Sequence, residues 1–101
     1  MIAGQVAIDD DGKLVGEDSM TAQAEFVFAQ IDGILLACGA TFADVVKTTF
    51  FVTDISRIGE VATIRHRYIS KNFPASTAVE VSKLAHPGLL LEVEVMAIVQ
   101  R

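Results

Sequence analysis

The spacing of hydrophobic residues along the first forty positions predicts a strand followed by a helix. Residues 1–8 (MIAGQVAI) favour a strand, and residues 9–12 (DDDG) a turn. Asp18 or Ser19 is placed to cap a helix by accepting from its free N–H groups. That helix should bury the residues at helical spacing and stop at a glycine: Ala24, Val27, Phe28, Ile31, Leu35 and Cys38, then Gly39.

A second strand and a second helix come next. Residues 44–53 (DVVKTTFFVT) are β-branched and aromatic, which favours a strand. Its two faces are predicted to carry Val46, Thr48, Phe50 and Val52 on one side, and Val45, Lys47, Thr49 and Phe51 on the other. Ser56 should open the helix, with an inner side of Ile58, Val61, Ile64 or Arg65, and Tyr68. The basic stripe Arg57, Arg65, His66 and Arg67 is interpreted as a solvated face.

Two strands complete the pattern, at residues 77–83 and 89–99, with a hairpin-like loop at 85–88. The last strand (LLLEVEVMAIV) is apolar on both faces except at Glu92 and Glu94, which is typical of a central strand covered on both sides. Helices between strands and a closing hairpin predict an α+β fold with the helices on one face of the sheet. The opposite face, which also carries apolar groups, would need another subunit.

Composition supports a single oligomeric domain spanning residues 1–101. A hydrophobic fraction of 51% and a mean hydropathy of +0.46 are high for so small a chain, so some apolar surface should be buried between subunits. The net charge of −5 argues against sequence-independent nucleic-acid binding. The single cysteine, the lack of a long apolar run and the lack of a secretory signal predict a cytoplasmic protein without a membrane span.

The carboxylates of the last strand are the main candidates for chemistry. Glu92 and Glu94 are two residues apart and so share a face with Met96. A carboxylate among apolar neighbours is kept by hydrogen bonds or for catalysis, or else it lies at the sheet margin in water. The sequence leaves these alternatives open for both residues.

The other polar residues favour structural roles. Glu80 shares a face with Ser76 and Ala78 and is expected to make a structural hydrogen bond. Cys38 is expected to be a small core residue rather than a nucleophile. No metal-ligand spacing and no glycine-rich nucleotide motif occurs, so neither a metal nor a cofactor is predicted.

Four segments, taken in order, resemble the Rid/YjgF family of reactive-intermediate deaminases, formerly described as L-PSP endoribonucleases. They are AGQVAIDDDGKLVGED (3–18), DVVKTTFFVTDI (44–55), FPASTAVEV (73–81) and LLLEVEVMAI (89–98). The resemblance covers nearly the whole chain. It implies a chorismate-mutase-like fold with a mixed sheet, a homotrimer around a central barrel, and a pocket in each cleft between subunits. The family's first strand would precede Met1 and is absent, as in a truncated or shortened member.

The resemblance also implies a chemistry. Members hydrolyse enamines and imines made by pyridoxal-phosphate enzymes to 2-oxo acids and ammonia. An arginine after the Pro-Ala pair binds the substrate carboxylate, and a glutamate on the last strand positions the attacking water. Glu92 matches that glutamate as the catalytic residue, and Gly4 matches a glycine lining the pocket. Ser76 stands at the arginine position, Ala78 where many members have cysteine, and Ala62 where many have asparagine.

Two functions of different classes follow from this comparison. The first is a deaminase like those acting on 2-iminobutanoate and 2-iminopropanoate but of unusual substrate range, in which Glu92 holds the water and Ser76 contacts the substrate. The second is a non-catalytic trimer that binds a small ligand in the same cleft. Ribonuclease activity ranks third, because the chain is acidic and lacks a basic groove. The positive charge missing at position 76 could come from a neighbouring subunit, through Arg65, Arg67 or Lys83. The sequence gives no evidence for any of the three.

Overall fold

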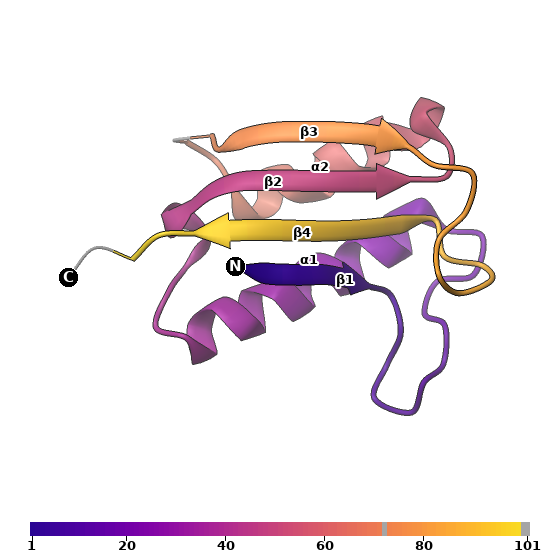
Figure 1. The fold of residues 1–101 in the computed structure, drawn as a ribbon, viewed down its shortest axis with the longest axis horizontal. Coiled ribbons are helices and arrows are strands. Elements are labelled where there is room, and N and C mark those ends of the chain that lie inside the picture. The colour runs from indigo at the N-terminus through magenta and orange to yellow at the C-terminus, as the bar shows by residue number, and fades with distance from the viewer. Residues whose placement is uncertain (72, 100–101) are drawn as a thin grey trace.

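The sheet of the computed structural model, which describes residues 1–71 and 73–99, has four strands with two helices on one side (Figure 1). The spatial order of its strands is β1-β4-β2-β3. The elements are β1 (Ile2–Val6), α1 (Met20–Ala37), β2 (Val45–Val52), α2 (Ile58–Tyr68), β3 (Ala75–Glu80) and β4 (Leu91–Ala97). Strand β4 is antiparallel to β1 and β2, whereas β2 and β3 are parallel. The predicted α+β class, mixed sheet and one-sided helices are confirmed.

The predicted hairpin between the last two strands is wrong. Strand β3 pairs with β2, from Lys47↔Ala75 to Val52↔Glu80, and β4 lies on the other side of β2. The reason is the connection through α2, because a strand–helix–strand unit returns the chain parallel to the strand it left. The segment after β3 therefore crosses to the far side of β2 before β4 begins (Figure 1). The prediction that β4 is central is confirmed.

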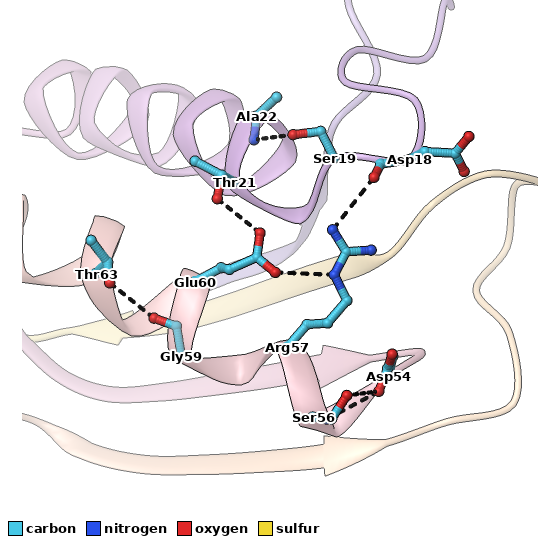
Figure 2. A network of polar contacts seen from close by, with 10 residues as sticks. All are labelled: Asp18, Ser19, Thr21, Ala22, Asp54, Ser56, Arg57, Gly59, Glu60 and Thr63. Carbon is cyan, nitrogen blue, oxygen red and sulfur yellow. Dashed lines mark hydrogen bonds and ion pairs between the residues drawn. The ribbon is translucent and has the colours of Figure 1, made fainter.

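Helix α1 supplies much of the core. The Ser19 side chain caps it by accepting from the N–H of Ala22 at 3.1 Å (Figure 2). Its buried stripe consists of Met20, Gln23, Ala24, Val27, Phe28, Ile31 and Leu35. Gly39, with φ of +76°, ends the helix as predicted. Cys38 is exposed, contrary to the prediction of a core position, because it lies at the C-cap beyond the last helical residue.

A buried glutamine joins α1 to two loops. The Gln23 amide group donates to the carbonyls of Gly16 and Gly88, at 3.2 and 3.0 Å. Its carbonyl oxygen accepts from the N–H of Leu90 at 2.8 Å, just before β4 begins. All three bonds compensate for burial of a polar side chain that is fully inaccessible to solvent. Gln23 thereby fixes the entry of β4 into the sheet.

Helix α2 begins later than Ser56, the predicted opening residue. Residues 55–57 form a 3-10 turn, in which the Asp54 carboxylate accepts from the N–H of Ser56. The α-helix proper starts at Ile58. Like α1, α2 is too short or too polar to span a membrane, and the described residues contain no helix that could do so.

A polar network attaches the start of α2 to the start of α1 (Figure 2). The Arg57 Nε donates to Glu60 Oε2 at 3.0 Å, and an Nη donates to the carbonyl of Asp18 at 3.4 Å. The hydroxyl of Thr21 donates to Glu60 Oε1 at 2.9 Å. Arg57 is thus paired within the chain, at a contact between the two helices.

The two faces of the sheet differ in burial. On the helix side, β2 buries Thr48, Phe50 and Val52, as the alternation predicts. The prediction fails at the start of β2, where Val45 is buried and Val46 is 41% exposed. A register shift between Val45 and Lys47 reverses the alternation there. The face away from the helices has no covering element among the described residues; it includes Lys47, Thr49, Phe51, Glu92, Glu94 and Met96.

Candidate functional site

Glu92 lies on the open face of the sheet, as the second residue of the central strand β4. On central strand β4 it pairs with Val6 of β1 on one side and with Phe51 of β2 on the other, and it is half-buried. A Cβ atom built on Gly4 would lie 2.7 Å from both the Glu92 Cδ and Oε2. Only glycine leaves room for the carboxylate in this position. The structure therefore brings together two predicted site residues, Gly4 and Glu92.

Glu94 occupies the next outward position of β4. It pairs with Thr49 and lines a shallow hollow of about 50 Å³ together with Lys47 and Met96. The ion pairs among the described residues are Arg57–Glu60 and Arg67–Glu25, so neither Glu92 nor Glu94 takes part in one. Both carboxylates lie on the open face, where a second protein surface or a ligand would meet them.

Ser76 and Ala78 lie on the helix side of edge strand β3. They pair with Thr48 and Phe50, which point toward the helices. The Thr48 hydroxyl donates to the Ser76 hydroxyl oxygen at 3.1 Å, which leaves the Ser76 hydrogen free to donate elsewhere. Glu80, on the same face, accepts from the N–H of Ile55 at 2.9 Å, and this confirms its predicted structural hydrogen bond.

A small hollow separates β3 from α2. Its volume is about 60 Å³, and the residues that line it are Phe50, Ile58, Val61, Ala62, Arg65, Ser76 and Ala78. The two alanines leave the space that larger side chains would fill. Ser76 and Ala78 are exposed, so the hollow opens to solvent along the β3 edge.

The site residues predicted from the sequence fall into two groups on opposite faces of the sheet. Glu92 and Gly4 belong to the open face, whereas Ser76 and Ala78 belong to the helix side. Alternation along the paired strands separates the groups, because neighbouring residues of a strand point to opposite faces. Within one chain, the predicted catalytic carboxylate and the predicted substrate-binding serine therefore do not meet.

The sequence left two positions open for Arg65, the inner side of the helix and the solvated basic stripe, and the structure supports the first. The prediction of a solvated basic stripe holds for His66 and Arg67, which are exposed, but Arg65 lines the hollow. Its Nε is buried and has no hydrogen-bond partner among the described residues. The signal was present in the spacing, because Ile58, Val61, Ala62 and Arg65 occupy positions i, i+3, i+4 and i+7 of one helix face.

Two carboxylates near the start of α2 have lowered pKa values. Hydrogen bonds from Arg57 and then Thr21 lower the pKa of Glu60, and the hydrogen bonds from Ser56 lower the pKa of Asp54. Both groups stabilise the loop and helix contacts near the start of α2. Among residues 1–71 and 73–99, no three or more His, Cys, Asp or Glu side chains gather as metal ligands would.

Comparisons with known proteins extend over nearly the whole chain. The family model described as Endoribonuclease L-PSP matches residues 1–99. Human 2-iminobutanoate/2-iminopropanoate deaminase is 33% identical over 97 residues, which cover 96% of this chain and 70% of that protein. The putative regulator AldR of Lactococcus lactis is 35% identical over 96 residues, covering 94% of this chain and 75% of AldR.

Solved structures agree with the arrangement of the elements. A YjgF/YER057c/UK114 family member from Mycobacterium tuberculosis superposes with a TM-score of 0.82 at 38% identity, covering 96% of this chain and 75% of that one. The Rid family protein YyfA of Yersinia pestis gives a TM-score of 0.88 at 40% identity, covering 96% and 77%. The likeness therefore includes both the sequence and the fold.

Proposed function

This chain belongs to the endoribonuclease L-PSP family, the family of the YjgF and Rid proteins, and we propose that it is a hydrolytic deaminase of small reactive imines and enamines. Water adds to the imine carbon, the C–N bond breaks, and the products are a carbonyl compound and ammonia. The proposal is supported by human, rat and mouse relatives named 2-iminobutanoate/2-iminopropanoate deaminase, at 31–33% identity. Residue 76 is serine in this chain, so we propose a substrate range different from theirs.

The observation that carries the proposal is the carboxylate of Glu92 beside Gly4. A half-buried carboxylate with a free acceptor oxygen can hold a water molecule and take its proton as the oxygen attacks the imine carbon. The same group can return the proton to the departing nitrogen. Gly4 contributes by leaving the carboxylate its space.

A site that uses both groups of residues requires two copies of the chain. We propose a homotrimer in which the open face of one subunit lies against the α2–β3 hollow of the next. Contacts of this head-to-tail kind close into a ring when the rotation allows it. Glu92 and Gly4 would then come from one subunit, and Ser76 and Ala78 from its neighbour. Exposed apolar side chains such as Met96, which is 40% exposed, favour burial of this face. The cytoplasmic location stays a prediction.

The alternative is a trimer that binds a small ligand without hydrolysing it. Ser76 favours this alternative, because a hydroxyl lacks the charge and the two parallel donors with which a guanidinium grips a carboxylate. Ala62 and Ala78 also leave fewer polar groups in the hollow.

An imine-hydrolysis assay separates the two functions. Imines are generated in situ by an amino-acid oxidase acting on several amino acids, and by an amine oxidase acting on an uncharged amine. The deaminase releases ammonia faster than spontaneous hydrolysis does, and Glu92→Gln removes the acceleration. A trimer that accelerates no imine in either series would overturn the proposed reaction and leave the binding function.

A further inference from the structure

The hollow between α2 and β3 is suited to one small charged group. Divided by the cavity volume that one buried water needs, the volume of about 60 Å³ holds roughly four to six water molecules. This is enough for a carboxylate but too little for a large molecule. Most of its wall is apolar, and its polar side chains are those of Arg65 and Ser76. Neither of these two can carry a negative charge.

Arg65 differs from the other arginines that the structure describes. Arg57 pairs with Glu60 at 3.0 Å, and Arg67 pairs with Glu25 at 3.1 Å. Arg65 takes part in neither ion pair, and its buried Nε has no acceptor among the described residues. A buried donor of a charged group that lacks a partner is costly, so native proteins rarely keep one without a reason.

No acidic side chain of the hollow offsets this charge. Glu80 is on the same face of β3, but it is not among the residues that line the hollow, and its Oε1 accepts from the N–H of Ile55.

We propose that Arg65 binds the carboxylate of a small ligand in this hollow. Its planar guanidinium offers parallel donors that match two carboxylate oxygens, and Arg65 lines the hollow. The Ser76 hydroxyl, held by Thr48, donates a further hydrogen bond from β3. The anion-binding charge thus comes from α2 instead of β3. This inference rests on the proposed function for the identity of the ligand, and it makes that ligand a 2-imino acid rather than an uncharged imine.

Binding measured without turnover tests the inference. The probe is 2-oxobutanoate, the carbonyl product that hydrolysis of 2-iminobutanoate gives, titrated calorimetrically into the intact protein. Arg65→Gln should weaken its binding by about tenfold to a hundredfold, the range for a lost hydrogen bond to a charged group. Arg67→Gln is the matched control, because Arg67 lies on the same helix, is exposed and pairs with Glu25; it should leave binding unchanged. The uncharged 2-oxobutanamide should bind the wild type as weakly as 2-oxobutanoate binds Arg65→Gln.

A second variant, Arg65→Lys, distinguishes a lost ligand contact from misfolding. Arg65→Lys keeps the charge but loses the planar pair of donors, so it should bind with an affinity between those of wild type and Arg65→Gln. Equal affinities of wild type and Arg65→Gln for 2-oxobutanoate would overturn the inference. A second result would also overturn the inference: the wild type does not bind 2-oxobutanoate, and the Arg65→Gln protein loses its subunit contacts. Arg65 would then pair with a carboxylate of a neighbouring copy instead of a ligand.

The outcomes also separate this inference from the proposed reaction. A protein that binds 2-oxobutanoate through Arg65 yet hydrolyses no imine keeps the inference and removes the deaminase. Imine hydrolysis that is unchanged in Arg65→Gln, at substrate concentrations below saturation, keeps the deaminase and removes the inference.

Discussion

The helix side and the open side of the sheet are made by alternate residues of the same strands, but their chemistry differs. The helix side buries Phe50 and Val52 against α1 and α2, and at its β3 edge it holds the cation Arg65 in a hollow without a carboxylate. The open side carries the carboxylates Glu92 and Glu94 and exposed apolar groups. Among the described residues, the helix side thus holds a cation without an ion pair beside its hollow, and the open side holds two carboxylates without one, together with Lys47.

On the proposed function, each face therefore carries one part of a site. A single chain cannot bring the parts together, because the sheet itself lies between them. A contact between the open face of one copy and the α2–β3 edge of another would join them. It would also cover apolar surface that the described residues of one chain leave exposed.

The largest difference between the two sides is expected when adjacent residues of β2, one on each side, are truncated to alanine. Phe50 is 3% exposed and stacks on Phe28 with ring centroids 6.3 Å apart, so Phe50→Ala should lower the free energy of unfolding by about 3–5 kcal/mol. Phe51 is half-buried on the open face, so Phe51→Ala should mainly weaken association. Urea unfolding and sedimentation measure the two effects. If Phe51→Ala were the more destabilising change in urea, with its subunit contacts intact, the two sides would not differ as described.

Next in size is the effect of neutralising one carboxylate of the open side. Glu92→Gln should lower imine hydrolysis by about 10²–10⁴-fold, the usual contribution of a positioned acid–base group, with little change in melting temperature. Glu94→Gln is the matched control, since Glu94 shares the strand and the face. Turnover per folded protein is the measurement. Equal losses in the two variants would remove Glu92 as the catalytic residue.

A smaller effect is expected from crowding the carboxylate of Glu92. Gly4→Ala places a methyl group where it would meet the Glu92 carboxylate at 2.7 Å, and the flexible side chain should move aside. Turnover should fall by about tenfold or more because misplaced catalytic groups lose rate steeply, while unfolding in urea should hardly change. Unchanged turnover in this variant would show that the observed position of Glu92 does not matter for the reaction.

The smallest effect concerns a paired carboxylate on the helix side, Glu60. Its pKa is lowered by hydrogen bonds, so it stabilises the folded state fully above its ordinary pKa of 4.5. This contribution is lost as the pH falls below that value through the lower pKa of the folded state. Glu60→Gln should therefore make the acid side of the stability curve flatter, as followed by melting temperature against pH. An acid side as steep as that of the wild type would contradict this role.

Much of the fold was predictable because its signals are local. The order of strands and helices, the Ser19 cap and the stop at Gly39 depend on residues close together in the chain. The pairing of β3 was missed because a turn-like sequence at 85–88 favours a hairpin, whereas the partner, β2, lies a whole helix away. The exposure of Val46 follows from a register shift that no side-chain pattern announces.

The site was less predictable for a related reason. Gly4 and Glu92 are far apart in the sequence, and only the pairing of β1 with β4 brings them together. Arg65 was interpreted by residue type, as a charge that prefers water, although the helical spacing also placed it on the inner face. A long side chain can satisfy both descriptions, with a buried stem and a polar end in a hollow.

In the proposed trimer, one site is made by two copies, with Glu92 from one and Arg65 from its neighbour. Mixing two impaired variants tests this arrangement: Glu92→Gln and Arg65→Gln chains are mixed in equal amounts, unfolded and refolded together, and assayed for imine hydrolysis at substrate concentrations below saturation. Random assembly into a head-to-tail ring leaves about a quarter of the interfaces with both residues intact, so about a quarter of wild-type activity should return. A mixture no more active than the two variants refolded separately, with mixed assemblies demonstrated by mass, would contradict the claim.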